Sequence, residues 1–246
     1  MTDANGPGLQ IRDVTILRGG RPVVKGVSIA VEPGEVTTML GPNGAGKSSL
    51  ALAISGLLRT AHGTITLDGA RIENRRPERV RSAGVSVVPE GRRLLSDLTV
   101  RDNMKAATYS LPKDEAAEGL AYVLELFPEL QKRWDIGARL LSGGEQQMVV
   151  LGQALVSRPK ILVIDELSLG LAPIIVKRLV PTLAKVAGSG VGVLLIEQFA
   201  HIALSVANRA YVLEGGQVRY DGTAAELKAR PELLHSAYLL GHEGRQ

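Results

Sequence analysis

A glycine-rich segment has the residue types and the spacing that bind phosphate. It consists of Gly41, Pro42, Asn43, Gly44, Ala45, Gly46, Lys47 and Ser48, which match the pattern G-x-x-x-x-G-K-[ST]. Its glycines allow backbone N–H groups to approach phosphate oxygens, while Lys47 can reach the β- and γ-phosphates and Ser48 can ligate Mg²⁺. A predicted strand precedes the segment, and a predicted helix that contains Ser49 follows it. The segment therefore predicts a site for nucleotide phosphates.

Two adjacent acids are the second candidate for chemistry. Asp165 and Glu166 follow the apolar run Ile161–Ile164, which predicts a buried strand. Because side chains alternate along a strand, we expect the two carboxylates to point differently and to have different roles. Asp165 would hold Mg²⁺, directly or through water, and Glu166 would activate the attacking water as general base.

A second glycine-rich loop opens a predicted helix after Leu141. Ser142 and Glu145 have the spacing of a capping box, in which each side chain accepts a hydrogen bond from the other residue's backbone N–H. A helix that begins with serine, Gly143 and Gly144 is also an anion site. The first loop already covers one side of the nucleotide. The sequence motif alone therefore leaves open which molecule's phosphate the second site binds.

The rest of the chain predicts a scaffold that can hold these residues. Buried strands such as Val85–Val88 and Val191–Ile196 alternate with helical segments, which predicts an α/β fold with a mostly parallel sheet covered on both faces. Ligands bind such sheets at the carboxyl ends of the strands. Alternating apolar residues in 9–16 and 26–31 predict strands of an N-terminal β lobe.

The helical pattern of Val100–Leu130 predicts an inserted α-helical lobe. We therefore expect one domain over residues 1–246, with a core at about 9–98 and 141–240 and a helical lobe at about 99–140. The pattern also predicts that the chain ends in a helix at 223–240.

Composition excludes several classes of protein. The chain has 246 residues, of which 45% are apolar, so it can bury a substantial core. It lacks cysteine, which excludes disulfides, thiolate metal sites and cysteine nucleophiles. It also lacks a signal-peptide pattern and any apolar run of the roughly 20 residues that cross a bilayer. These absences predict a cytoplasmic protein.

The net charge of +4 reflects several arginines between positions 71 and 93. They favour a solvated surface over a patch for nucleic acid or acidic lipid, since glutamates are interspersed and only 3% of residues are aromatic. We expect no nucleic-acid partner. These arginines are Arg71, Arg75, Arg76, Arg79, Arg81, Arg92 and Arg93.

Leu141–Gln147 resembles the signature sequence of ABC ATPases, and it lies 23 residues before Asp165, as that family would have it. The resemblance runs from about Leu9 to about Leu240. It implies that ATP and Mg²⁺ are bound and that two subunits associate head to tail. The phosphate loop of one subunit and the signature loop of the other, here Ser142, Gly143, Gly144 and Glu145, would then enclose each ATP.

Within the family, Val88–Arg92, Leu141–Met148 and Ser168–Pro173 look like one ATPase subunit of branched-chain amino acid uptake systems. That resemblance implies a homodimer, or a heterodimer with a second ATPase subunit. Integral membrane permease subunits would bind it directly, and an external substrate-binding protein would act indirectly. It also implies a location on the inner face of the cell membrane.

The resemblance assigns roles to three further residues. Glu90 stands where most members have glutamine, at the hinge of the helical lobe, and joins Ser48 and Asp165 as an expected metal ligand. Gln198 stands where a switch histidine is usual, and completes the expected catalytic set with Glu166 and Lys47. Arg18 replaces the aromatic that commonly stacks on adenine; a guanidinium can also stack on a π face.

Two other positions depart from the family. Leu167 replaces a proline after the acids, and Ala172 replaces an aspartate that crosses the dimer interface. Neither departure removes a residue that is expected to bind phosphate, ligate the metal or act as the base. Both bear on nucleotide affinity and on the coupling between the two ATP sites of the expected dimer.

Four alternatives are open at this point. An importer of amides or urea has similar motifs. A soluble ABC ATPase of DNA repair or translation usually has coiled-coil insertions or tandem domains, which this chain lacks. A small-molecule kinase has no use for Leu141–Glu145, and a non-catalytic nucleotide-binding module does not need Lys47, Asp165 and Glu166.

Overall fold

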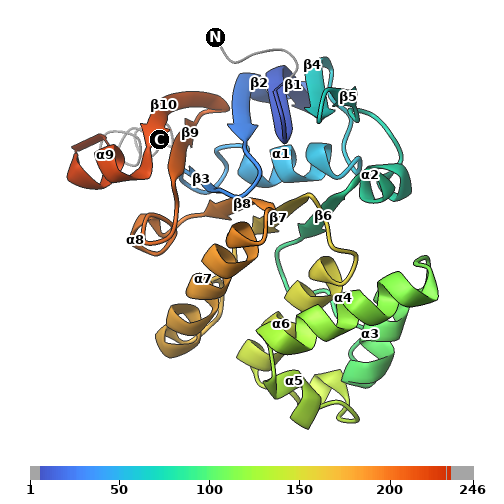
Figure 1. The fold of residues 1–246 in the computed structure, drawn as a ribbon. Coiled ribbons are helices and arrows are strands. Elements are labelled where there is room, and N and C mark those ends of the chain that lie inside the picture. The colour runs from blue at the N-terminus through green and yellow to red at the C-terminus, as the bar shows by residue number, and fades with distance from the viewer. Residues whose placement is uncertain (1–5, 231, 234–246) are drawn as a thin grey trace.

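Two β-sheets organise the chain in the computed structural model, which describes residues 6–230, 232 and 233. The first sheet is antiparallel and has the order β2-β1-β4-β5, with strands β1 (Leu9–Arg18), β2 (Arg21–Val31), β4 (His62–Leu67) and β5 (Ala70–Arg71). Figure 1 shows this sheet at the top of the molecule, above helix α1 (Lys47–Ile54). The predicted β lobe is therefore confirmed, and its second strand begins earlier than expected, at Arg21.

The second sheet has the order β10-β9-β3-β8-β7-β6. Its strands from β9 to β6 run parallel, and β10 pairs antiparallel with β9 at one edge. The strands are β3 (Val36–Leu40), β6 (Val85–Val88), β7 (Ile161–Asp165), β8 (Gly192–Glu197), β9 (Arg209–Glu214) and β10 (Gln217–Thr223). This mostly parallel sheet confirms the predicted fold class.

The register of the central strands brings their functional ends together. Leu40 at the end of β3 lies opposite Glu197 at the end of β8, and Asp165 at the end of β7 lies opposite Ile196. The phosphate loop, the two acids and Gln198 therefore all lie at the carboxyl ends of the parallel strands. Open α/β sheets bind their ligands at these strand ends.

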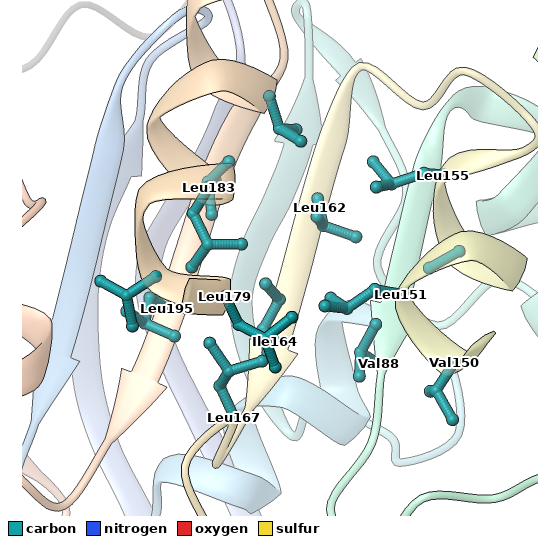
Figure 2. Packing of buried hydrophobic residues seen from close by; sticks show 14 of the residues in the cluster. Val88, Val150, Leu151, Leu155, Leu162, Ile164, Leu167, Leu179, Leu183 and Leu195 are labelled. Atoms are coloured by element: carbon teal, nitrogen blue, oxygen red, sulfur yellow. The ribbon is translucent and has the colours of Figure 1, made fainter. Parts of the chain in front are cut away.

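Each central strand contributes to two separate cores, one on each face of the sheet. In β7, Leu162 and Ile164 belong to the core shared with the helices α6 (Gly143–Leu155) and α7 (Pro173–Gly188), as Figure 2 shows. Ile161 and Val163 point to the other core, which α1 and the antiparallel sheet complete. Apolar residues at successive positions are thus explained by burial on both faces.

The remaining helices between β6 and β7 gather with α6 at the lower end of the molecule (Figure 1). α4 packs so closely on the C-terminal end of α6 that a Cβ built on Gly119 would lie 1.8 Å from the carbonyl oxygen of Val156. Only glycine fits at this position. An ion pair between Glu129 and Arg178 of α7 ties this group to the core. The helices are α3 (Val100–Thr108), α4 (Lys113–Leu126) and α5 (Glu129–Lys132), followed by a 3₁₀ turn at Ala138–Leu140.

Three short helices differ from the sequence-based expectation. Helix α2 (Pro77–Ala83) was not predicted, because its sequence is rich in arginine and only Val80 is buried. α8 (Ala200–Ala203) is shorter than the predicted helix 199–206. α9 (Ala224–Ala229) ends at Ala229, and position 231 and positions 234–240 of the predicted helix 223–240 lie outside the described residues. Among the described residues, no helix has both the length and the apolar character that a membrane crossing requires.

Candidate active site

The phosphate loop connects β3 to α1 and needs its glycines. Gly44 and Gly46 have φ angles of 82° and 109°, which glycine adopts without the strain that other residues incur. A Cβ on Gly46 would also lie 2.5 Å from the carbonyl oxygen of Val23. The loop therefore fits tightly against β2, and its backbone leads directly into the N-terminus of α1, where anions are favoured.

Lys47 is buried and folds back over this loop. Its Nζ donates to the carbonyl oxygens of Gly41 and Pro42 at 2.8 and 3.1 Å. Burial lowers the pKa of Lys47, while the nearby carboxylates, Glu166 and Asp165 foremost, act in the opposite direction. The ammonium group thus lies where the predicted phosphate site requires a positive charge.

Asp165 ends β7 in a buried position, 5% exposed. Its Oδ1 is a buried oxygen without a hydrogen-bond partner. Burial raises the pKa of this carboxyl, and a hydrogen bond with Ser48 partly opposes the shift. A buried, unsatisfied carboxylate oxygen costs stability, which a cation at this position would offset.

Glu166 does not continue the strand. Its φ angle is 57°, in the left-handed region that non-glycine residues rarely adopt, and its N–H donates to the carbonyl oxygen of Ile196. Burial raises the pKa of Glu166, and Glu90 adds to the shift by charge repulsion. The predicted difference in direction between the two acids thus comes from a change in backbone conformation at the end of the strand. A raised pKa also suits a general base.

A cavity of about 440 Å³ brings half of the predicted site residues together. It is lined by Lys47, Ser48, Ser49, Glu90, Glu166 and Gln198, together with Asn43, Gly44 and Gly46 of the phosphate loop. Val23 and Leu169 complete its wall and were not predicted. Their side chains are apolar, and only the tertiary structure places them here.

Several predicted residues are not part of this cavity wall. Gly41, Pro42 and Ala45 of the phosphate loop and the expected metal ligand Asp165 lie outside it. Arg18 lies exposed at the end of β1, opposite Arg21, so its contact with adenine stays a prediction. Ser142, Gly143, Gly144 and Glu145 form the start of α6, where both hydrogen bonds of the predicted capping box are present. The signature loop thus lies apart from the chain's own phosphate pocket, and its nucleotide contact also stays a prediction.

Glu197 is a further residue that the sequence did not single out. It is 1% exposed, and its carboxylate accepts hydrogen bonds from both the N–H and the hydroxyl of Ser168. Ser168 begins the turn that leads to Leu169 in the cavity wall. Glu197 therefore fixes the loop after Glu166 to the end of β8, directly before Gln198.

The donor set fits a Mg²⁺ ion that arrives with a nucleotide. Within the described part of the chain, no three or more His, Cys, Asp or Glu side chains form a preassembled metal site. Mg²⁺ is usually held by one or two protein oxygens together with phosphates and waters. The Ser48 hydroxyl and the unsatisfied Oδ1 of Asp165 match that pattern. Glu90 is exposed in the same cavity, and its role as a ligand stays a prediction.

Comparison with known proteins decides the family. The ABC transporter family matches residues 24–168, which include the phosphate loop, the start of α6 and both acids. The chain is 42% identical to the high-affinity branched-chain amino acid transport ATP-binding protein BraG of Pseudomonas aeruginosa, over 87% of this chain and 92% of BraG. The chain belongs to the ABC transporter family. As an ABC ATPase, it binds and hydrolyses ATP.

Two more relatives agree with this assignment. The ABC ATPase is 33% identical to a probable branched-chain amino acid transport ATP-binding protein, LivF, of Archaeoglobus fulgidus, over 82% of this chain and 86% of LivF. Its fold matches the crystal structure of the ADP conformation of MJ1267, an ATP-binding cassette of an ABC transporter, with a TM-score of 0.83 and 26% identity. That match covers 94% of this chain and 98% of MJ1267.

Proposed function

We propose that this ABC ATPase powers the uptake of branched-chain or other small hydrophobic amino acids through separate membrane permease subunits. BraG and LivF are both named as branched-chain amino acid transport proteins, and their similarity covers most of this chain. These names support the proposed substrate class. The observation that carries the ATPase part is the cavity in which Lys47, Ser48, Glu166 and Gln198 meet. The protein would act on the cytoplasmic face of the membrane that holds its permease.

Each cavity residue has a distinct task in hydrolysis. Lys47 and the phosphate-loop N–H groups bind the β- and γ-phosphates and stabilise the charge that develops on them. Glu166 accepts a proton from the attacking water, which its raised pKa favours. Gln198 orients the γ-phosphate or the water with its amide, which can donate and accept hydrogen bonds but does not titrate.

Mg²⁺, held by Ser48 and Asp165, would neutralise phosphate charge when bound. Asp165 is suited to this task because its Oδ1 is buried without a hydrogen bond and already close to Ser48. Burial raises the pKa of both Asp165 and Glu166, and the negative charges of Glu90 and Glu197 add to both shifts. This concentration of negative charge attracts cations.

The complete site is proposed to need two ATPase subunits. The start of α6 has a serine, two glycines and a helix N-terminus, which together favour an anion. Because this loop does not line the chain's own cavity, the phosphate it binds would belong to ATP on a second subunit. The partner is either another copy of this chain or a second ABC ATPase subunit.

A second hollow is proposed to hold the permease. It has a volume of about 410 Å³ and lies between α2 and β6 of the core and α3 and α6. Pro89 and Arg93 belong to its wall, so it adjoins the loop that carries Glu90. A permease segment seated here would touch the core and the helical lobe at once, and could transmit movements between them.

Transport in a defined system tests the proposed function. The tagged chain is purified with its permease from native membranes, reconstituted in liposomes with ATP on its own side, and supplied with the cognate binding protein. Labelled leucine should accumulate with wild-type protein and not with the Glu166→Gln variant. Accumulation of urea or an amide instead of leucine would show that the substrate class is wrong. A rate of ATP hydrolysis that is unaffected by the permease and the binding protein would contradict the transport role.

A further inference from the structure

One arginine connects three loops that are far apart in the sequence. Arg92 lies two residues after Glu90, and its Nη2 donates to the carbonyl oxygens of Leu169 and Gly170 at 3.2 and 3.0 Å. Leu169 lines the nucleotide cavity, as does Glu90. The guanidinium thus joins the loop after β6 to the loop that follows Glu166.

The same guanidinium rests on the signature loop. A Cβ built on Gly143 would lie 2.6 Å from Nη1 of Arg92, and one built on Gly170 would lie 2.8 Å from Nη2. Both distances are too short for a real Cβ, so the guanidinium occupies space that two glycines leave open. Gly143 is the first residue of α6, beside the Ser142 cap.

The backbone indicates that Arg92 is held in place rather than free on the surface. Its φ angle is 44°, in the left-handed region, where an arginine is strained. Its side chain is half-buried, unlike that of the exposed Arg93. Such strain persists where surrounding contacts fix the conformation, and the two carbonyl bonds are contacts of that kind. Arg92 is thus partly exposed, but it makes specific contacts that the expected solvated surface does not account for.

We propose that Arg92 is a positioning residue that couples the chain's own ATP site to the signature loop. When the cavity closes on ATP, a movement of Glu90 or Leu169 is transmitted through the guanidinium to Gly143. This inference rests on the proposed dimer, because the signature loop would serve the ATP of the other subunit. Arg92 does not line the chain's own cavity, so it acts through the loops that it holds.

Arginine suits this role for a geometric reason. Its guanidinium is planar and carries five N–H donors, so one edge can bond two carbonyls while another faces a third loop. A lysine ammonium is a compact charge on a flexible stem and does not reproduce that bridge. Charge alone is therefore not expected to be sufficient.

The first test compares Arg92→Ala and Arg92→Lys with wild type and with Arg101→Ala. Arg101 is an exposed arginine paired with Asp135, and a pair of that kind contributes little. We expect both Arg92 variants to bind a fluorescent ATP analogue within about twofold of wild type, because they leave the cavity wall intact. Their hydrolysis rate at saturating ATP and protein should fall about tenfold or more, as for lost bonds to a charged group. Arg101→Ala should match wild type in both measurements.

The second test is a double-mutant cycle between Arg92 and Gly143. Gly143 has no left-handed φ angle, so Gly143→Ala is tolerated by the backbone and acts by displacing the guanidinium. In the Arg92→Ala background the added methyl group has room. The loss of rate caused by Gly143→Ala should therefore be several-fold smaller in that background, whereas independent sites would give equal losses.

The outcomes separate this inference from the proposed dimer. Equal losses in both backgrounds, full activity of Arg92→Lys, or a parallel fall in nucleotide affinity would each overturn the coupling role. A lowered melting temperature with a normal rate per folded molecule would reduce Arg92 to a purely structural residue and would also overturn it. Wild-type hydrolysis that does not depend on protein concentration would contradict the dimer, and the coupling role with it.

Discussion

Glu197 accepts two hydrogen bonds from Ser168, one from the backbone N–H and one from the hydroxyl, and both are 2.9 Å long. The two residues are 29 positions apart and both are buried. Their contact fixes the turn after Glu166 to the end of β8. The position of the proposed base therefore depends on a carboxylate that does not line the nucleotide cavity.

Ser168→Ala tests this contact. The substitution leaves a buried carboxylate oxygen of Glu197 without its hydroxyl partner, which should lower the free energy of unfolding by about 1–3 kcal/mol. Urea unfolding measures the loss. Ser205→Ala is the control, because its hydroxyl bonds to the carbonyl oxygen of Ile202 at an exposed site. Equal, small effects of the two substitutions would contradict a structural role for the Glu197 contact.

Glu166→Gln should separate ATP binding from hydrolysis. The amide keeps the size of the side chain but does not accept a proton, so turnover should fall about 10²–10⁴-fold. Lys47 and the phosphate loop are unchanged, so nucleotide affinity should stay near that of wild type. Equilibrium binding and phosphate release measure the two quantities. Near-normal phosphate release would mean that another group acts as the base.

Asp165→Asn should stabilise the nucleotide-free protein while it abolishes hydrolysis. Burial raises the pKa of Asp165, so the folded protein binds this proton more strongly than the unfolded chain. Stability is therefore lost as the pH rises through the folded pKa, and at neutral pH the ionised carboxylate is a cost. Removing it should raise the free energy of unfolding on the order of 1 kcal/mol, a typical cost of a functional residue.

The pH dependence provides the check on Asp165. The gain from Asp165→Asn should shrink as the pH falls toward the unfolded value of about 3.9, where the wild-type carboxyl is protonated in both states. Asp97→Asn is the matched control, because Asp97 is 87% exposed in a long ion pair with Arg139. A loss of stability in Asp165→Asn at neutral pH would show that the carboxylate is well satisfied in the apoprotein.

Gln198 and His201 compete for the role of γ-phosphate sensor. Gln198 lines the nucleotide cavity, whereas His201 is exposed on α8 and lines a separate apolar hollow beside α7. Gln198→Ala should therefore cut hydrolysis sharply, and Gln198→His should be tolerated. His201→Ala should leave the rate and its pH profile unchanged. If His201→Ala cuts hydrolysis sharply and Gln198→Ala does not, the roles are reversed.

Cysteine crosslinking tests the proposed permease surface, and the native chain contributes no cysteine of its own. Ala106 on α3 lines the hollow between the core and the helical group, so Ala106→Cys should crosslink to a cysteine introduced in the permease. Arg219→Cys on β10, at the far edge of the sheet, should not. Crosslinking at Arg219 alone would place the permease on the other side of the molecule.

Local patterns were sufficient to predict the motifs of this site. Lys47 and Ser48 follow glycines within one loop, and Asp165 ends a strand that is recognisable from its apolar run. Glu197 and Arg92 could not be found in this way, because their partners are 29 and more than 70 residues distant. The register that joins β3, β7 and β8 is likewise a property of the folded sheet.

Boundaries of short elements were the least predictable part of the fold. α2 has one buried residue, so its sequence carries little periodic signal. Glu166 was expected to differ from Asp165 through strand alternation, but its left-handed backbone makes the difference. Such a conformation arises from tertiary contacts, here the bond from its N–H to Ile196.

The assignment of alternate β7 residues to two cores has a consequence for the evolution of the site. A single-residue deletion within Ile161–Ile164 would exchange the residues that face each core. The side chains on one side of the deletion would then meet the wrong partners, and the carboxyl that ends the strand would emerge on the opposite face. The strand therefore tolerates changes of residue type far better than changes of length, so insertions and deletions should be excluded here even where the apolar residues themselves drift.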